Sequence, residues 1–84
     1  MISDTAKSRT IIREAASQVA GRPVKDSQRL ISSGLIDSLS ILKLIALLEK
    51  GLHVSIPTET LQPEDFDDVD TILETIARVA EPAA

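Results

Sequence analysis

Apolar residues recur at helical spacing in three separate stretches of this 84-residue chain, and that pattern restricts it to a small helical fold. The stretches are residues 4–20, 38–50 and 70–80. A shorter segment, 63–67, opens with Pro63 and two carboxylates, which favours one short helical turn. The sequence therefore predicts an all-α fold: a small four-helix bundle of three longer helices and a short third helix, with a long first loop.

Capping and turn residues predict where these helices begin and end. We expect the three longer helices to begin at capping side chains: Ser3 or Asp4, Asp37 or Ser38, and Asp70. Gly21 and Gly51 are expected to end the first two. The loop over 21–37 mixes turn-forming residues with aliphatic ones, so we expect it to be pinned to the core.

The composition excludes most catalytic and metal chemistry. The chain has room for one domain, residues 1–84, and none for a deep active-site cleft. It has no Cys and one His, His53, which excludes disulfides, thiolate or His-cluster metal sites and a protein thiol nucleophile. We therefore expect neither an enzyme nor a metal site.

Charge and hydropathy narrow the range of partners. A net charge of −4, a pI of about 4.8 and a single aromatic residue, Phe66, argue against nucleic acid as a partner. No run reaches the ~20 apolar residues of a membrane span, and the N-terminus is no targeting signal. We therefore expect a cytoplasmic protein that binds no membrane. Residues 1–50 hold eight basic and five acidic side chains, whereas residues 51–84 hold one basic and eight acidic side chains.

The helix predicted at 38–50 is apolar nearly all round. One arc, expected to face the core, holds Ile41, Leu44, Ile45, Leu48 and Leu52. The opposite arc holds Leu39, Lys43, Ala46 and Lys50, flanked by Leu42 and Leu47. Such a helix is either fully buried or presents a second apolar surface to a partner. Periodicity alone leaves both possibilities open.

Ser38 stands where this helix begins, directly after Asp37. Its hydroxyl can cap the helix, as serines at this position usually do, or it can project as an attachment point. The positive end of the helix favours an anion there, so a phosphodiester on Ser38 would be well placed.

The run Gly34-Leu35-Ile36-Asp37-Ser38-Leu39 resembles the attachment motif of acyl carrier proteins. In that family, an Asp-Ser-Leu at the start of the second helix carries a 4′-phosphopantetheine arm on the serine. The segment 52–57 resembles the family's sequence after this helix, and 63–69 resembles its short third helix and the entry to the fourth. The resemblance extends over residues 4–80.

The resemblance implies a non-catalytic carrier, a monomer of acyl-carrier type. A phosphopantetheinyl transferase would attach the arm to Ser38 from coenzyme A, and acyl or aminoacyl ligases and synthases would load and use its thiol. We expect the partner-binding residues to be Asp37, Leu39, Leu42, Lys43, Ala46 and Lys50. Asp37 has two possible roles there, as a helix cap and as a contact for the transferase and its metal.

The chain departs from the carriers of fatty acid synthesis, whose second helix is strongly acidic. Here Glu49 is the only carboxylate within that helix. The longer segment before Phe66 resembles stand-alone aminoacyl carriers of the D-alanyl type or natural-product carriers, whereas peptidyl carriers often have His in place of Asp37. The cargo therefore stays open between acyl and aminoacyl or peptidyl groups. An unmodified helical interaction module is the alternative from another class.

Two further features have open interpretations. Acidic residues cluster late in the chain at Glu64, Asp65, Asp67, Asp68 and Asp70. They form either a docking surface or a solvated face. Phe66 is expected in the core, with a role in a cargo pocket as the weaker alternative.

Overall fold

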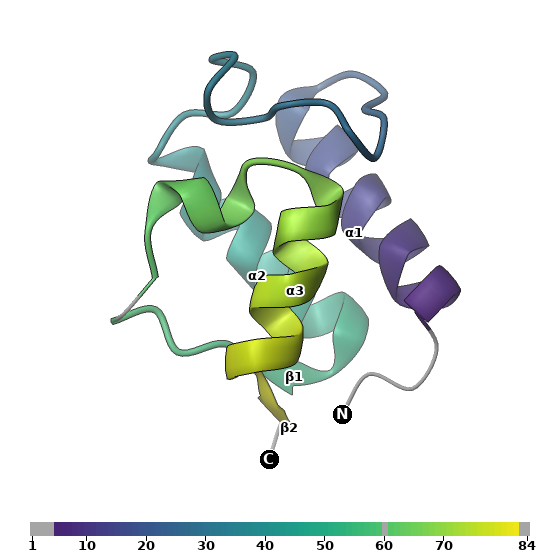
Figure 1. Ribbon diagram of the computed structural model, residues 1–84, viewed down its shortest axis with the longest axis vertical. Coiled ribbons are helices and arrows are strands. Elements are labelled where there is room, and N and C mark those ends of the chain that lie inside the picture. Colours follow the sequence, from purple (N-terminus) through teal and green to yellow (C-terminus); the bar gives the residue numbers. More distant parts are fainter. Residues whose placement is uncertain (1–4, 60, 83–84) are drawn as a thin grey trace.

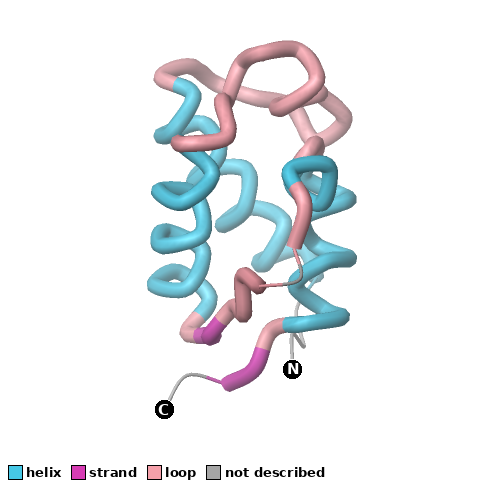
Figure 2. Tube along the Cα trace, turned by 90° about the vertical axis from the view of Figure 1, so that its left-hand side faces the viewer, coloured by secondary structure: helices cyan, strands magenta, loops and turns pink. Residues whose placement is uncertain are grey.

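Three α-helices stand side by side, and a long loop crosses one end of them in the computed structural model, which describes residues 5–59 and 61–82 (Figures 1 and 2). The elements in chain order are α1 (Thr5–Ala20), α2 (Ser40–Leu52), β1 (Val54–Ser55), the 3-10 helix η1 (Pro63–Phe66), α3 (Val69–Val79) and β2 (Glu81–Pro82). Helix α1 packs against both α2 and α3, and η1 packs against α3. Strands β1 and β2 pair antiparallel at the end opposite the long loop.

The three longer helices lie where the hydrophobic spacing predicts them, but two details of the predicted bundle differ. The short helix expected at 63–67 is a four-residue 3-10 helix, so the described residues contain three α-helices. The two-residue strands were not predicted, because such short segments carry no alternating hydrophobic pattern. The fold is therefore mostly helical, with a very small sheet.

The core is aliphatic around one phenylalanine. Phe66 is 1% exposed, as expected of a core residue. The inner arc of α2 is buried at Ile41, Leu44, Ile45 and Leu48 and half-buried at Leu52. The long loop is pinned to the core, as its aliphatic content predicts, because it buries Val24, Leu30 and Ile36.

Two helix ends differ from the sequence-based expectation. Helix α2 continues through Gly51 to Leu52, and His53, at φ 55° and ψ 49°, is the left-handed residue that closes it. Helix α3 is capped by Asp68, whose side chain accepts from the Thr71 N–H at 2.7 Å, and not by Asp70. The end of α1 at Gly21 is confirmed, whereas Ser3 and Asp4 lie outside the described residues.

Gly51 lies within α2 at the point where α1 passes very close to the helix. A Cβ built on Gly51 would lie 2.8 Å from Cγ2 of Ile11. Real Cβ atoms essentially never approach another heavy atom within 3.0 Å, so Ile11 or the helix backbone would have to shift. The glycine therefore sets the separation of α1 and α2, a role that spacing along one helix cannot reveal.

We expect Gly51→Ala to lower the free energy of unfolding by about 1 kcal/mol. Alanine gains about 0.5–1 kcal/mol over glycine in a helix interior, but forcing a methyl into a filled site costs about 1–3 kcal/mol. Urea unfolding followed by circular dichroism measures the difference. In an Ile11→Ala background the clash is absent, so the same substitution should become stabilising; a loss of equal size in both backgrounds would contradict this explanation.

Candidate functional site

The start of α2 is held by Asp37. Its carboxylate Oδ1 accepts a hydrogen bond from the Ser40 N–H at 2.8 Å. Its backbone carbonyl accepts from the N–H groups of Ser40 and Ile41 at 3.1 and 3.2 Å. Hydrogen bonds from the N–H and the hydroxyl of Ser40 hold the pKa of Asp37 below its ordinary value, outweighing the opposing effect of burial. Asp37 thus serves as the cap of this helix.

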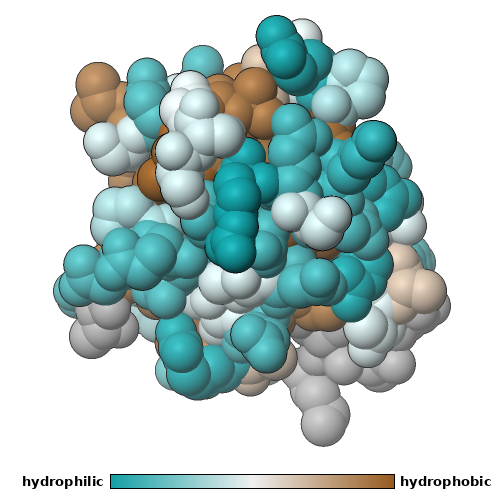
Figure 3. Space-filling model, turned by 45° about the horizontal axis from the view of Figure 1, so that its top comes forward, coloured by the Kyte–Doolittle hydropathy of each residue, from teal (hydrophilic) through white to brown (hydrophobic). Residues whose placement is uncertain are grey.

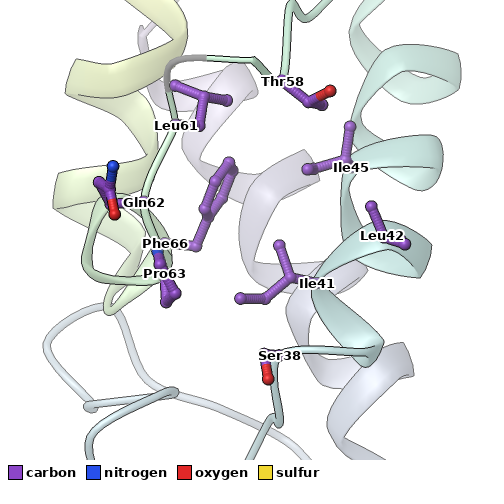
Figure 4. A pocket seen from close by; sticks show the side chains of 9 residues that line it. All are labelled: Ser38, Ile41, Leu42, Ile45, Thr58, Leu61, Gln62, Pro63 and Phe66. Atoms are coloured by element: carbon purple, nitrogen blue, oxygen red, sulfur yellow. The ribbon is translucent and has the colours of Figure 1, made fainter.

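Ser38 is exposed, and its hydroxyl is not used in the fold. No described residue forms a hydrogen bond with this hydroxyl. In Figure 4 it lies at the edge of a pocket and points away from Phe66 and Ile41. Of the two roles open to Ser38 from the sequence, capping falls to Asp37, and the serine oxygen is left accessible at the positive end of α2.

An apolar pocket of about 170 Å³ opens beside Ser38. Its walls come from the first turns of α2 and from the segment that leads into η1, with the ring of Phe66 between them (Figure 4). The lining residues are Ser38, Ile41, Leu42, Ile45, Thr58, Leu61, Gln62, Pro63 and Phe66. The core position of Phe66 and a place in a pocket wall are therefore compatible. The sequence did not reveal this pocket, because its two walls are about 20 residues apart in the chain.

The outward face of α2 is apolar and basic. Leu39, directly before α2, and Leu42, within it, are 82% and 64% exposed, so the helix is not fully buried. Lys43, Ala46 and Lys50 are exposed on the same helix. We call these five residues the α2 face. The carboxylate of Glu49 does not contribute to it, since it accepts from the Ile56 N–H at 2.8 Å.

Four of the five carboxylates in the acidic run late in the chain bond within the protein, while Glu64 and Asp70 are exposed to solvent. Asp65 accepts from the Gln62 N–H at the start of η1. Asp68 caps α3, and Asp70 pairs with Arg9. Asp67 is buried and bonds to the long loop.

The end of the molecule that carries the loop is mainly hydrophilic. In Figure 3, which brings the top of Figure 1 forward, hydrophobic side chains emerge in patches toward the upper part of the view.

Within the described residues, no group of three or more His, Cys, Asp or Glu side chains is arranged to hold a metal ion. None of the described helices has the length and apolar character needed to cross a membrane.

Comparison with known proteins adds one decisive observation. The model of a family described as "Phosphopantetheine attachment site" matches residues 10–79, which is most of the chain. The chain belongs to this family. No curated protein and no solved structure matched in the corresponding comparisons. The resemblance to acyl carrier proteins drawn from the Asp37-Ser38-Leu39 motif is thereby confirmed at the level of the family.

The phosphopantetheine attachment-site family carries a covalently attached 4′-phosphopantetheine group. The site described above fits such a group, because an exposed, unbonded hydroxyl adjoins both a helix N-terminus and an apolar pocket. A helix N-terminus favours the negative phosphate. The group supplies a thiol, which a chain without Cys lacks.

Proposed function

We propose that this chain is a carrier whose Ser38 receives the 4′-phosphopantetheine arm. The supporting observation is the Ser38 hydroxyl, exposed and without a hydrogen bond in the described residues, beside an Asp37 that takes over the capping role. In the transfer, the Ser38 oxygen bonds to the pantetheine-bearing phosphorus of coenzyme A. The pyrophosphate bond breaks, 3′,5′-ADP leaves, and the hydroxyl proton passes to a base of the transferase.

The chain itself contributes position and charge, and we propose no catalytic step of its own. The N-terminal end of α2 provides a favourable field for the phosphodiester. Asp37 keeps the helix start fixed and leaves the neighbouring oxygen accessible. The reactions on the cargo belong to partner enzymes.

The pocket beside Ser38 favours an acyl cargo over an aminoacyl one. Its side chains are mainly apolar: aliphatic residues together with the aromatic ring of Phe66. A short acyl chain would bury apolar surface there, worth about 0.8 kcal/mol per CH₂. An aminoacyl group carries a charged ammonium, whose entry into the same space would be unfavourable without a partner charge.

Intact-mass measurement tests the proposal. Incubation with coenzyme A and a broad-specificity phosphopantetheinyl transferase should add the mass of one phosphopantetheine group to the chain. Absence of any gain under conditions that modify a known carrier would overturn the proposed function and would favour an unmodified interaction module.

We further propose that the α2 face contacts partner enzymes. Leu39, Leu42 and Ala46 offer apolar contact area along the helix that follows Ser38, and the two lysines add positive charge. The complementary surface on a partner would therefore be an apolar depression bordered by carboxylates. This polarity is opposite to that of a carrier with an acidic second helix.

Reversing the two charges should slow association with a partner. We expect Lys43→Glu with Lys50→Glu to lower the association rate with the ligase that loads the arm about tenfold at low salt, because electrostatic steering is lost. Stopped-flow mixing at two ionic strengths measures the rate. Lys25→Glu, on the long loop, is the matched control. Unchanged rates in the double variant would show that these lysines do not steer the partner.

A further inference from the structure

We infer that Asp67 is a positioning residue for the modification of Ser38, an inference that rests on the proposed function. Asp67 follows η1 directly, and its side chain is 12% exposed. Its backbone N–H closes η1 by donating to the Glu64 carbonyl, but its side chain caps no helix and is not part of the α2 face. Among the described residues, its carboxylate bonds only to the long loop, at Arg29, Ile31 and Ser32.

Five interactions join Asp67 to four consecutive loop residues. Its Oδ1 accepts from the N–H groups of Ile31 and Ser32, both at 2.9 Å. Its Oδ2 accepts from the Ser32 hydroxyl and lies 3.4 Å from the Arg29 guanidinium. Its backbone carbonyl accepts from the Leu30 N–H at 2.6 Å. Burial raises the pKa of Asp67, but the bonds from Ser32 and Ile31 and the charge of Arg29 together lower it to about 2.

The same loop residues hold the segment that enters Ser38. The Ile36 N–H donates to the Leu30 carbonyl at 2.8 Å, and the side chain of Ile36 is buried. The Gly34 N–H donates to the Ile31 carbonyl at 3.0 Å, with Gly34 at φ +80°. Thus backbone hydrogen bonds to Leu30 and Ile31 close the turn that leads into Ser38. Leu30 and Ile31 are two of the loop residues that bond to Asp67.

On its other side Asp67 is joined to the pocket wall. Phe66, the preceding residue, lines the pocket beside Ser38, as does Pro63 of η1. A hollow of about 230 Å³ lies between the loop and η1, lined by Ile31, Ser32, Pro63, Glu64 and Asp67. Packing at this junction is therefore incomplete, and hydrogen bonds to Asp67 fix the loop there. The carboxylate connects the Ser38 side of the pocket to its Phe66 side.

Removing this connection should reduce the fraction of molecules that present Ser38 in the form the transferase binds. When only a fraction of molecules is competent, the apparent affinity falls by that fraction, while bound molecules react normally. We therefore expect Asp67→Ala to raise the KM of the transferase for this chain about tenfold and to change kcat by less than about twofold. Asp67→Asn, which keeps one acceptor oxygen, should raise KM about threefold.

Asp68→Asn is the matched control. It removes one carboxylate from the adjacent position, weakens the α3 cap and loses a pair with the Arg29 guanidinium at 3.7 Å, but the Asp68 carboxylate bonds to no backbone N–H of the loop. All variants are assayed at a temperature at which circular dichroism shows them fully folded, so that global unfolding cannot change KM. Amide hydrogen exchange should quicken at Ile31, Ser32 and Ile36 in the Asp67 variants and stay unchanged in α1.

The outcomes separate the two proposals. Modification of the wild type with an unchanged KM in Asp67→Ala overturns the positioning role and leaves the proposed function standing. An equal KM rise in Asp68→Asn also overturns it, since the bonds from the Asp67 carboxylate to the backbone of the loop would then not be the cause. A wild type that is never modified overturns the proposed function itself.

Discussion

Replacing Ser38 with alanine should abolish the mass gain that the wild type shows with coenzyme A and transferase. The substitution removes the only oxygen to which the proposed phosphodiester bond can form at this position. It should leave the fold intact, because the hydroxyl is exposed and no described residue bonds to it. We expect the free energy of unfolding to change by less than about 0.5 kcal/mol, as for other surface substitutions.

Ser40 offers the matched control for this experiment. It lies two residues further on, at the first position of α2, and its N–H bonds to Asp37. Ser40→Ala should still gain one phosphopantetheine group, because the backbone bond to Asp37 is kept. A mass gain that survives Ser38→Ala, or one that is lost only in Ser40→Ala, would refute Ser38 as the attachment residue.

Replacing Phe66 with alanine should have the largest effect on stability. Phe66 is 1% exposed and is the single aromatic residue of the chain, so no neighbouring ring can move in to fill the space. Truncation of a buried phenylalanine to alanine costs about 3–5 kcal/mol. Since small domains are stable by only about 5–15 kcal/mol, the variant should be marginally folded.

Urea unfolding followed by far-ultraviolet circular dichroism measures this loss, since the chain has no Trp or Tyr to report by fluorescence. Phe66→Leu is the matched control, because leucine keeps most of the buried volume, and it should lose less than half as much. A loss below about 1 kcal/mol in Phe66→Ala would show that the ring contributes pocket surface and little core packing.

The sequence predicted those features that depend on periodicity within one element. The two arcs of α2 follow from a spacing of 3.6 residues, and they separate buried Leu44 and Leu48 from exposed Leu39 and Leu42 as expected. The helix ends were less predictable. Whether Gly51 ends the helix or allows α1 to pack closely against it depends on Ile11, which lies 40 residues earlier and is placed by tertiary packing.

The candidate site, too, was only partly predictable from the sequence. The motif pointed to Ser38, but only the structure shows Asp37 as the cap and the serine oxygen left without a partner. Among the clustered carboxylates, residue type cannot tell that Asp67 bonds to the loop while Asp68 caps α3. The one sequence clue is position: Asp67 lies between buried Phe66 and Val69, a place where an unpaired carboxylate would be costly.

The paired strands β1 and β2 give the molecule two unequal ends. They tie the exit of α2 to the exit of α3, near the point where Gly51 lets α1 approach. At the opposite end, a hollow lies between the long loop and η1. We therefore expect slow local opening to start between the long loop and η1, while the strand pairing at the opposite end stays intact.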